Sequence, residues 1–371
     1  MVFDGLDCIA AVWVNGKRAG RAANMFIPHR FDVTGLVHPA AGNELLARID
    51  PAVLVARQLH HTPDESNWAG HWERATVLRK AEHEYGFDMG PRIISAGLWR
   101  DVHLEVLPPT HWKSVYWATT QVDAKKKSAK LVLDWEFATP RIEIRDLQLR
   151  VILSRNGKTV LRRLTPVLST HGQDAMGVAD VALWWPRGAG DQPLYDAVVT
   201  LLDHEGHVLD ENKTRIGIRT VQLHNTEFTS AEKPGDFAFL VNGEKIFIKG
   251  ANWIPLDVLH SRDRKLVEEV FPMVLDLNCN MIRCWGGYVY ESDRFFDLCD
   301  ENGVLVWQEF CLGNARYPQR DEFFAAMREE AAAIIPRLRN HPSLAHWCGG
   351  SECDICYVGE NMDPNTNRRS Q

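Results

Sequence analysis

The stretch that decides the fold is Asn340-His341-Pro342-Ser343-Leu344-Ala345-His346-Trp347-Cys348-Gly349-Gly350-Ser351-Glu352. Pro342 ends the preceding helix, and the apolar residues after it predict a short buried strand. Two glycines then let the backbone bend, and Glu352 follows them. In a (β/α) barrel, a carboxylate at this end of a strand lies where catalytic groups lie. On the spacing alone, a surface glutamate after a turn is an equal alternative.

The sequence from about residue 236 to this stretch alternates between strand-like and helix-like segments. The predicted strands before it are Ile246 to Gly250, Met281 to Trp285 and Val304 to Trp307. Helical spacing separates them at 263–277, 292–301 and 321–338, with kinks expected at Pro272 and Pro336. Four such repeats predict parallel strands joined by right-handed crossovers.

Polar or aromatic residues end each predicted strand. They are Asn252-Trp253, Arg283 to Trp285, Gln308-Glu309 and Ser351-Glu352. Because the ends of parallel strands meet at one edge, these residues are expected to gather there. Four strands are half of an eight-stranded barrel, so we expect the chain to be the first part of a longer protein.

The sequence before residue 236 predicts two β units. Pro108-Pro109 marks the boundary between them, and Asn15-Gly16 and Asn156-Gly157 are hairpin signals. The predicted units are therefore 1–108, 109–225 and, for the barrel, 236–371. The first unit is expected to be truncated at its beginning, since strand-like sequence follows Met1 at once.

Composition restricts the partners and the compartment. The chain has 371 residues, a net charge of −7 and no long basic run, so nucleic acid and anionic membranes are disfavoured. It has no apolar stretch of transmembrane length. Its eight cysteines do not form a disulfide framework, and reduced thiols favour the cytoplasm. Cys353 and Cys356 lack a second pair at zinc-site spacing, so a metal or redox role is disfavoured.

Several motifs in order carry a family resemblance. They include Arg79-Lys80-Ala81, Trp184 to Gly188, Lys249 to Pro255, Arg283 to Gly287 and Trp307 to Phe310. Together they resemble glycoside hydrolase family 2, and most of all its β-mannosidase branch. The resemblance implies a jelly-roll, galactose-binding-like β-sandwich, an immunoglobulin-like β-sandwich and the first half of a (β/α)8 TIM barrel.

The resemblance also implies a reaction. The family's enzymes are retaining glycosidases that use two carboxylates, and a β-mannosidase would release terminal β-mannose without a metal or cofactor. By position, Glu352 matches the acid/base. The family's nucleophile is a glutamate on strand seven, so it is expected outside this chain, and the 371 residues alone are expected to be inactive. The alternatives are a galactosidase, glucuronidase or exo-glucosaminidase of the same family, and a non-catalytic carbohydrate-binding protein.

Four more positions match by resemblance. Arg283 matches the arginine that keeps the nucleophile ionised, and its alternative is a structural ion pair. Trp285 matches an aromatic wall of the sugar site, or belongs to the core. Asn252 and Trp253 line the pocket or buttress it.

Four further positions concern specificity. Asp88 resembles an aspartate that reaches from the first unit to the sugar hydroxyls, or forms a turn. Ser351 stands where the family usually has an asparagine that binds the 2-hydroxyl, and Phe87 and Met89 stand where tryptophans are usual. These departures leave the choice of sugar open.

Overall fold

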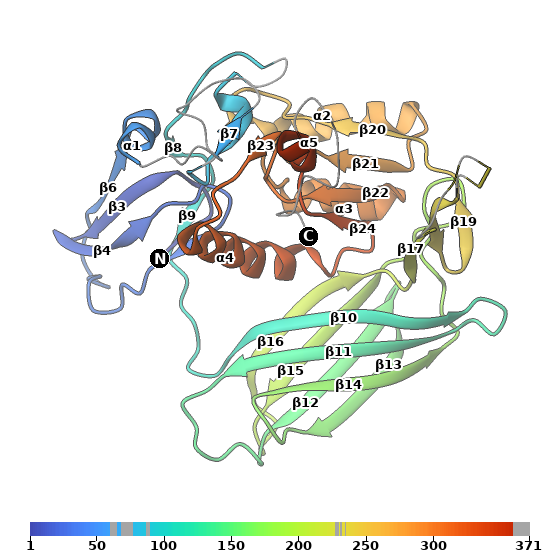
Figure 1. Ribbon diagram of the computed structural model, residues 1–371. Helices are drawn as coiled ribbons and strands as arrows, with labels where there is room; N and C mark the ends of the chain where they lie inside the picture. Colours follow the sequence, from blue (N-terminus) through green and yellow to red (C-terminus); the bar gives the residue numbers. More distant parts are fainter. Residues whose placement is uncertain are drawn as a thin grey trace.

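The computed structural model describes residues 1–59, 65–67, 77–86, 90–226, 230, 232–233 and 235–358. A β-sandwich and a parallel sheet with its helices lie side by side in one body, and a second sandwich lies beneath them (Figure 1). We call these parts the first sandwich, the parallel sheet and the second sandwich. The predicted fold class, two β-sandwiches followed by half of a TIM barrel, is confirmed.

The first sandwich is built from short antiparallel strands. Its sheets have the orders β4-β3-β6, β5-β1-β9 and β2-β8. Asn15 and Gly16 both have positive φ values, 51° and 75°, which matches the type I′ hairpin predicted between β3 and β4. The elements are β1 (Val2–Phe3), β2 (Leu6–Asp7), β3 (Ile9–Val14), β4 (Lys17–Ala22), β5 (His29–Arg30), β6 (Leu45–Asp50), α1 (Ala52–Gln58), β7 (Ser66–Asn67), η1 (Glu82–Glu84), β8 (Gly97–Leu98) and β9 (Val102–His103).

The second sandwich packs a three-stranded sheet, β10-β11-β14, on a four-stranded sheet, β13-β12-β15-β16. Buried and half-buried residues alternate along β11 and β12, so each strand turns one row of side chains to the shared core. The strands are β10 (His111–Asp123), β11 (Ser128–Ala138), β12 (Gln148–Arg155), β13 (Lys158–Pro166), β14 (His171–Ala179), β15 (Tyr195–Leu202) and β16 (Val208–Ile216).

A small antiparallel sheet connects the second sandwich to the parallel sheet. It consists of β17 (Val221–Asn225), β18 (Phe237–Val241) and β19 (Glu244–Ile246). The prediction of a first barrel strand at Ile246 to Gly250 is therefore wrong. Asn242 and Gly243 have φ values of 52° and 86° and fold this segment into a hairpin, so the first parallel strand begins only at Gly250.

The parallel sheet has the order β20-β21-β22-β24, as the four repeats predicted. Its strands are β20 (Gly250–Trp253), β21 (Met281–Cys284), β22 (Leu305–Glu309) and β24 (Leu344–Cys348). The helical segments are η2 (His260–Arg262), α2 (Asp263–Asp276), α3 (Asp293–Asn302), α4 (Asp321–Leu338) and α5 (Cys353–Val358), and β23 (Ala315–Arg316) follows β22. Pro272 and Pro336 lie inside α2 and α4, and both helices continue through them.

The stretch that decides the fold lies where α4 meets the second sandwich. Arg219 donates from Nε to the carbonyl of Pro342 over 2.9 Å and from Nη2 to that of Leu344 over 2.8 Å. Asn340 accepts from the backbone N–H of Trp117 over 2.9 Å. The second sandwich thus fixes the entry to β24.

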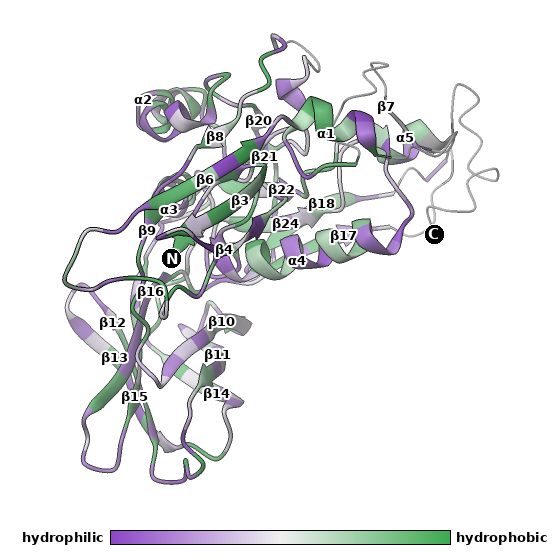
Figure 2. Ribbon diagram, turned by 90° about the vertical axis from the view of Figure 1, so that its left-hand side faces the viewer, coloured by the Kyte–Doolittle hydropathy of each residue, from purple (hydrophilic) through white to green (hydrophobic). Residues whose placement is uncertain are grey.

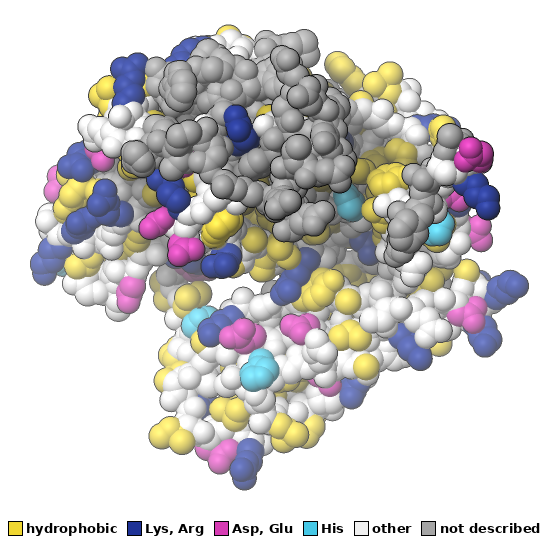
Figure 3. Space-filling model, viewed as in Figure 1, with side chains coloured by type: hydrophobic (Ala, Val, Ile, Leu, Met, Phe, Trp, Pro, Cys, Tyr) yellow, Lys and Arg dark blue, Asp and Glu magenta, His cyan; other side chains and the backbone are white. Residues whose placement is uncertain are grey.

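The surface and the hydropathy pattern are those of a folded globular body. β3 and β21 are mainly hydrophobic, while α4 mixes hydrophilic and hydrophobic residues along its length (Figure 2). Acidic and basic side chains are interspersed on the face drawn in Figure 3. Among the described residues, no helix combines the length and apolar character needed to span a membrane.

Candidate active site

The carboxyl end of the parallel sheet brings two predicted residues, Asn252 and Ser351, to the guanidinium of a third, Arg283. Asn252 and Arg283 are neighbours in register on β20 and β21. Arg283 Nη1 donates to Asn252 Oδ1 over 3.2 Å, and Nη2 donates to Ser351 Oγ over 3.0 Å. Arg283 therefore connects the end of the first strand to the segment after the fourth.

Glu309, at the end of β22, holds the side chain of Arg283 in place. Its Oε1 accepts from Arg283 Nε over 2.8 Å, and its Oε2 accepts from the backbone N–H of Gly286 over 2.8 Å. Glu309 is only 2% exposed. Because both oxygens are engaged, this carboxylate orients the guanidinium and the turn after β21.

Ser351 joins Arg283 to Trp285. Its hydroxyl oxygen accepts from Trp285 Nε1 over 2.6 Å as well as from Arg283, and the residue is 1% exposed. Its backbone is fixed in the same way, since Ser351 N–H donates to the carbonyl of Leu312 over 2.8 Å. The Ser351 hydroxyl thus holds the indole ring of Trp285 next to the guanidinium of Arg283.

Glu352 follows at the exposed side of this group. Its Oε2 accepts from Asn314 Nδ2 over 2.7 Å, and its φ of 53° places it in the left-handed region. That conformation is uncommon for a residue with a Cβ atom and persists where neighbouring contacts impose it. The backbone turn that follows Ser351 therefore sets the direction of the carboxyl group.

One predicted residue, Trp253, is not part of this group, and its position favours the second of its two alternatives, a buttress of the pocket. It is 7% exposed, its indole N–H donates to Glu291 Oε1 over 2.8 Å, and its ring packs on Phe295. Successive residues on a strand point to opposite faces. Asn252 faces the polar group, so Trp253 faces the helices and buttresses the sheet. Asp88, Phe87 and Met89 lie outside the described residues.

Two residues that hold the group together were not assigned from the sequence. Glu309 was recognised only as a polar strand end, and a buried carboxylate beside a predicted arginine is the signal that identifies its role. Asn314 lies in the loop between β22 and β23, where no sequence period indicates that its side chain turns toward Glu352.

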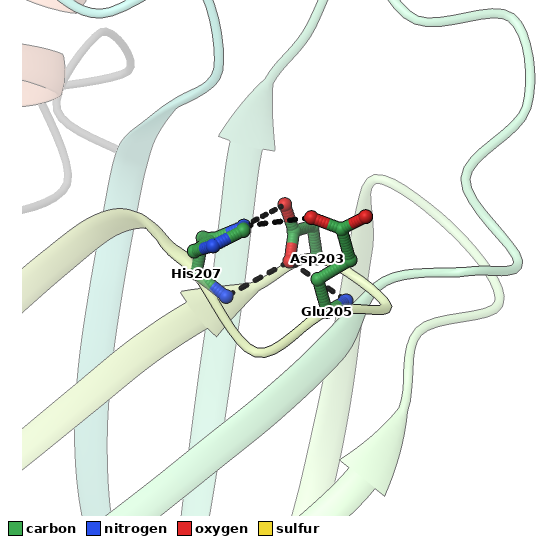
Figure 4. Close-up of side chains that lie close together, drawn as sticks. All are labelled: Asp203, Glu205 and His207. Carbon is green, nitrogen blue, oxygen red and sulfur yellow. Dashed lines mark hydrogen bonds and ion pairs between the residues drawn. The ribbon is translucent and has the colours of Figure 1, made fainter.

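Two clusters elsewhere bring carboxylates and a histidine close together. Asp203, Glu205 and His207 lie on the turn between β15 and β16, where Asp203 Oδ1 accepts from the backbone N–H groups of Glu205 and His207 (Figure 4). This is the hydrogen bonding of an aspartate that stabilises a turn. In the second cluster, Asp300 accepts from the backbone N–H of Ser343 and pairs with His341 at the base of β24.

Two curated fungal enzymes illustrate the similarity in sequence. The chain is 36% identical over 359 residues to β-mannosidase B of Thermothelomyces thermophilus and 35% identical over 371 residues to β-mannosidase B of Aspergillus terreus. These alignments cover 95% and 98% of this chain and 41% of each relative. The chain thus spans about two fifths of the length of the curated relatives it matches.

Similar solved structures extend the comparison. The crystal structure of a β-D-mannosidase from Dictyoglomus thermophilum has a TM-score of 0.87 and 30% identity, covering 97% of this chain and 44% of that one. A β-glucuronidase from Bacteroides uniformis has a TM-score of 0.68 at 19% identity, covering 94% of this chain and 38% of that one, which is a likeness of fold alone.

Three family profiles match successive parts of the chain. The galactose-binding domain-like profile of glycosyl hydrolase 2 matches residues 1–100, the glycosyl hydrolases family 2 profile matches 110–219, and the TIM barrel domain profile of that family matches 235–367. Together they account for both sandwiches and for the parallel sheet with its polar edge. The chain belongs to glycosyl hydrolase family 2.

Proposed function

We propose that this chain supplies part of the active site of a retaining glycosidase that releases terminal β-mannose, with Glu352 as its acid/base. The β-mannosidases that resemble it in sequence and structure support this activity. The observation that carries the proposal is the position of Glu352 beside Ser351, which Arg283 and Trp285 hold at the carboxyl end of the parallel sheet.

The chemistry assigns further roles. A retaining glycosidase protonates the glycosidic oxygen with one carboxyl and attacks the sugar with another about 5 Å away. The exposed carboxyl of Glu352 suits the first role, and we assign none of the described residues to the second. Trp285 would offer an indole face to the sugar, while Asn252, Arg283 and Ser351 would bind its hydroxyls or a facing carboxylate.

Two proposals concern the rest of the chain. Asp88 is proposed to reach the sugar from the first sandwich. We also infer that the chain divides near 108 and again near 220. The second boundary is supported by β17, which pairs with β18 in the small antiparallel sheet and lies before the predicted boundary at 225.

The test uses the protein expressed from its complete reading frame, with aryl β-mannosides, β-galactosides, β-glucuronides and β-glucosaminides as substrates. We expect preference for the mannosides. Glu352→Gln should lower kcat/KM for phenyl β-mannoside about 10²- to 10⁴-fold, because protonation of the leaving group is lost. Azide should restore turnover of dinitrophenyl β-mannoside and give a β-mannosyl azide.

A matched control separates this role from a general effect. Asp354→Asn removes an exposed carboxylate two residues away, on α5, and should leave activity unchanged. Undiminished activity of Glu352→Gln would refute the assignment. Tight binding of mannosides without turnover would instead identify a carbohydrate-binding protein.

A further inference from the structure

Asn314 contacts both the backbone and the carboxyl group of the segment that carries Glu352. Its backbone N–H donates to the carbonyl of Ser351 over 2.8 Å, and its side-chain Nδ2 donates to Glu352 Oε2 over 2.7 Å. Asn314 is 9% exposed, so its own side of both bonds is buried, while Glu352 is exposed. Its own φ of 41° lies in the left-handed region, which asparagine tolerates better than most residues.

The remaining atom of this amide is free to take a second role. Within the described part of the chain, Asn314 Oδ1 is buried and has no hydrogen-bond partner. A carboxamide exchanges its donor and its acceptor when it rotates by half a turn. In one orientation it donates to an ionised carboxylate, and in the other it accepts from a protonated one. An acid/base residue passes through both states in every turnover.

The first sandwich holds the loop that carries Asn314. Tyr317 donates its hydroxyl proton to Glu82 on η1 and accepts from the backbone N–H of Gly313 over 2.7 Å. Tyr317 and Glu82 are 6% and 3% exposed. The neighbouring backbone is attached as well, since His83 N–H donates to the carbonyl of Gly287 over 3.2 Å. The first sandwich thus holds residues 313–317 through Glu82 and the neighbouring turn at Gly287 through His83.

We propose that Asn314 is a positioning residue that supports Glu352 in both its protonated and its ionised form, and that Tyr317 and Glu82 hold Asn314 in place. This inference rests on the proposed acid/base role of Glu352. Among the described residues, the titratable and charged groups on the segments next to the carboxyl are Arg283 and Glu309 beyond Ser351, Glu82 and Tyr317 beyond Asn314, and Cys353 and Asp354 on α5.

The first test compares Asn314→Asp and Asn314→Ala in the protein from the complete reading frame. Both variants should lower kcat/KM for phenyl β-mannoside about 10- to 100-fold, because the acid is misplaced, and should affect the dinitrophenyl mannoside much less. In Asn314→Asp, a negative charge replaces the donor and disfavours the ionised carboxyl. The alkaline limb of the pH profile should therefore move to higher pH by about one unit.

Controls distinguish positioning from folding. Asn280→Asp changes a buried asparagine at the opposite edge of the parallel sheet, where it bonds to the backbone of Lys249 and Phe247, and should leave the pH profile unchanged. Tyr317→Phe should lower kcat in the same leaving-group-dependent way as Asn314→Ala, but by less. Equal losses on both mannosides, or an unmoved alkaline limb in Asn314→Asp, would overturn the proposal.

A second measurement does not depend on turnover. Titration of the Glu352 carboxyl by ¹³C NMR in this 371-residue chain, identified through Glu352→Gln, should show a higher midpoint in Asn314→Asp than in the unaltered chain. An unchanged midpoint would contradict the contact between the two side chains. If the midpoint moves but the wild type hydrolyses no glycoside, the proposed function fails while the contact stands.

Discussion

Ser351 links the segment after β24 to β21 and to the turn that follows β21, through a single oxygen atom. Its hydroxyl accepts from an arginine on β21 and from the indole of Trp285, at 3.0 and 2.6 Å, in a place that is 1% exposed. Such an oxygen contributes to stability mainly through the donors that it pairs. Leaving a buried donor without an acceptor costs more free energy than a hydrogen bond contributes on balance. Removal of this oxygen therefore has a larger effect than its size suggests.

Ser351→Ala should lower the free energy of unfolding of the chain by about 1 to 3 kcal/mol, because the indole N–H and one guanidinium N–H lose their acceptor. Urea denaturation followed by tryptophan fluorescence measures the change. Ser343→Ala is the matched control, since Ser343 Oγ is buried without a hydrogen-bond partner among the described residues. Its loss should be neutral or slightly stabilising. Equal losses in the two variants would count against the Ser351 network.

The sequence predicted that these residues gather at one edge of the sheet, but it did not predict the contacts between them. Asn252 and Trp253 were predicted together, yet strand alternation sends one to the polar edge and the other to the core. Periodicity identifies that alternation only when the register of the strand is known. The predicted strand, Ile246 to Gly250, ended where the observed strand begins, so it did not contain Asn252 and Trp253 and could not assign a face to either.

At the level of elements, helix α4 joins the first sandwich to the parallel sheet. Glu330 on α4 accepts from Arg79 Nε and Nη2, both over 2.8 Å, from Asn24 Nδ2 over 3.0 Å and from the hydroxyl of Tyr290 over 2.7 Å. The side chains of Glu330 and Arg79 are 0% and 4% exposed. A buried pair with every oxygen satisfied specifies one docking geometry more than it adds stability.

Glu330→Gln should lower the free energy of unfolding by about 3 to 5 kcal/mol, because it leaves the guanidinium of Arg79 buried without a counter-charge. Chemical denaturation gives the value. Glu329→Gln, one residue away on the exposed side of α4, should change stability by less than about 0.5 kcal/mol. A small effect at position 330 would mean that water reaches the pair in solution.

Elements with strong local signals were predicted well, and the others were not. The predicted helix 321–338 matches α4, and the helix at 292–301 matches α3 within one residue, with Ser292 as its N-cap and Gly303 at its C-cap. By contrast, Phe31-Asp32-Val33-Thr34 has a strand-like sequence, yet only the neighbouring His29–Arg30 forms a strand. Edge pairing in a sandwich depends on partners distant in sequence, which no local pattern contains.

At the scale of the whole molecule, a polar cluster is buried where the first sandwich meets the parallel sheet. Lys80 Nζ lies 2.5 Å from Asp7 Oδ1 and 2.6 Å from Glu84 Oε2 within the first sandwich. His260, at the start of the helical layer, places Nε2 3.6 Å from Glu84 Oε1 and packs its ring on His83 at 4.5 Å. The junction thus depends on the charge state of buried groups.

The buried groups act in opposite directions as pH changes. Burial lowers the pKa of His260 to about 3, and it also lowers that of His83. Their contribution to stability is therefore complete above pH 6.5 and is lost as the pH falls toward 3, where the unfolded chain binds more protons. Burial raises the pKa of Glu84 to about 7, so its contribution falls instead as the pH rises from about 4.5 to 7.

The pH dependence of the unfolding free energy, compared between wild type and His260→Gln, gives the contribution of His260 alone. Between pH 7 and pH 5, the wild type should lose about 2 kcal/mol of unfolding free energy relative to His260→Gln, because only the wild type must keep a neutral imidazole buried at pH 5. His171→Gln, at an exposed position on β14, is the control for the substitution itself. Urea denaturation at half-unit pH intervals measures both. A constant difference between wild type and His260→Gln would mean that the imidazole stays in contact with water. The cluster would then not exclude water from the junction between the first sandwich and the parallel sheet.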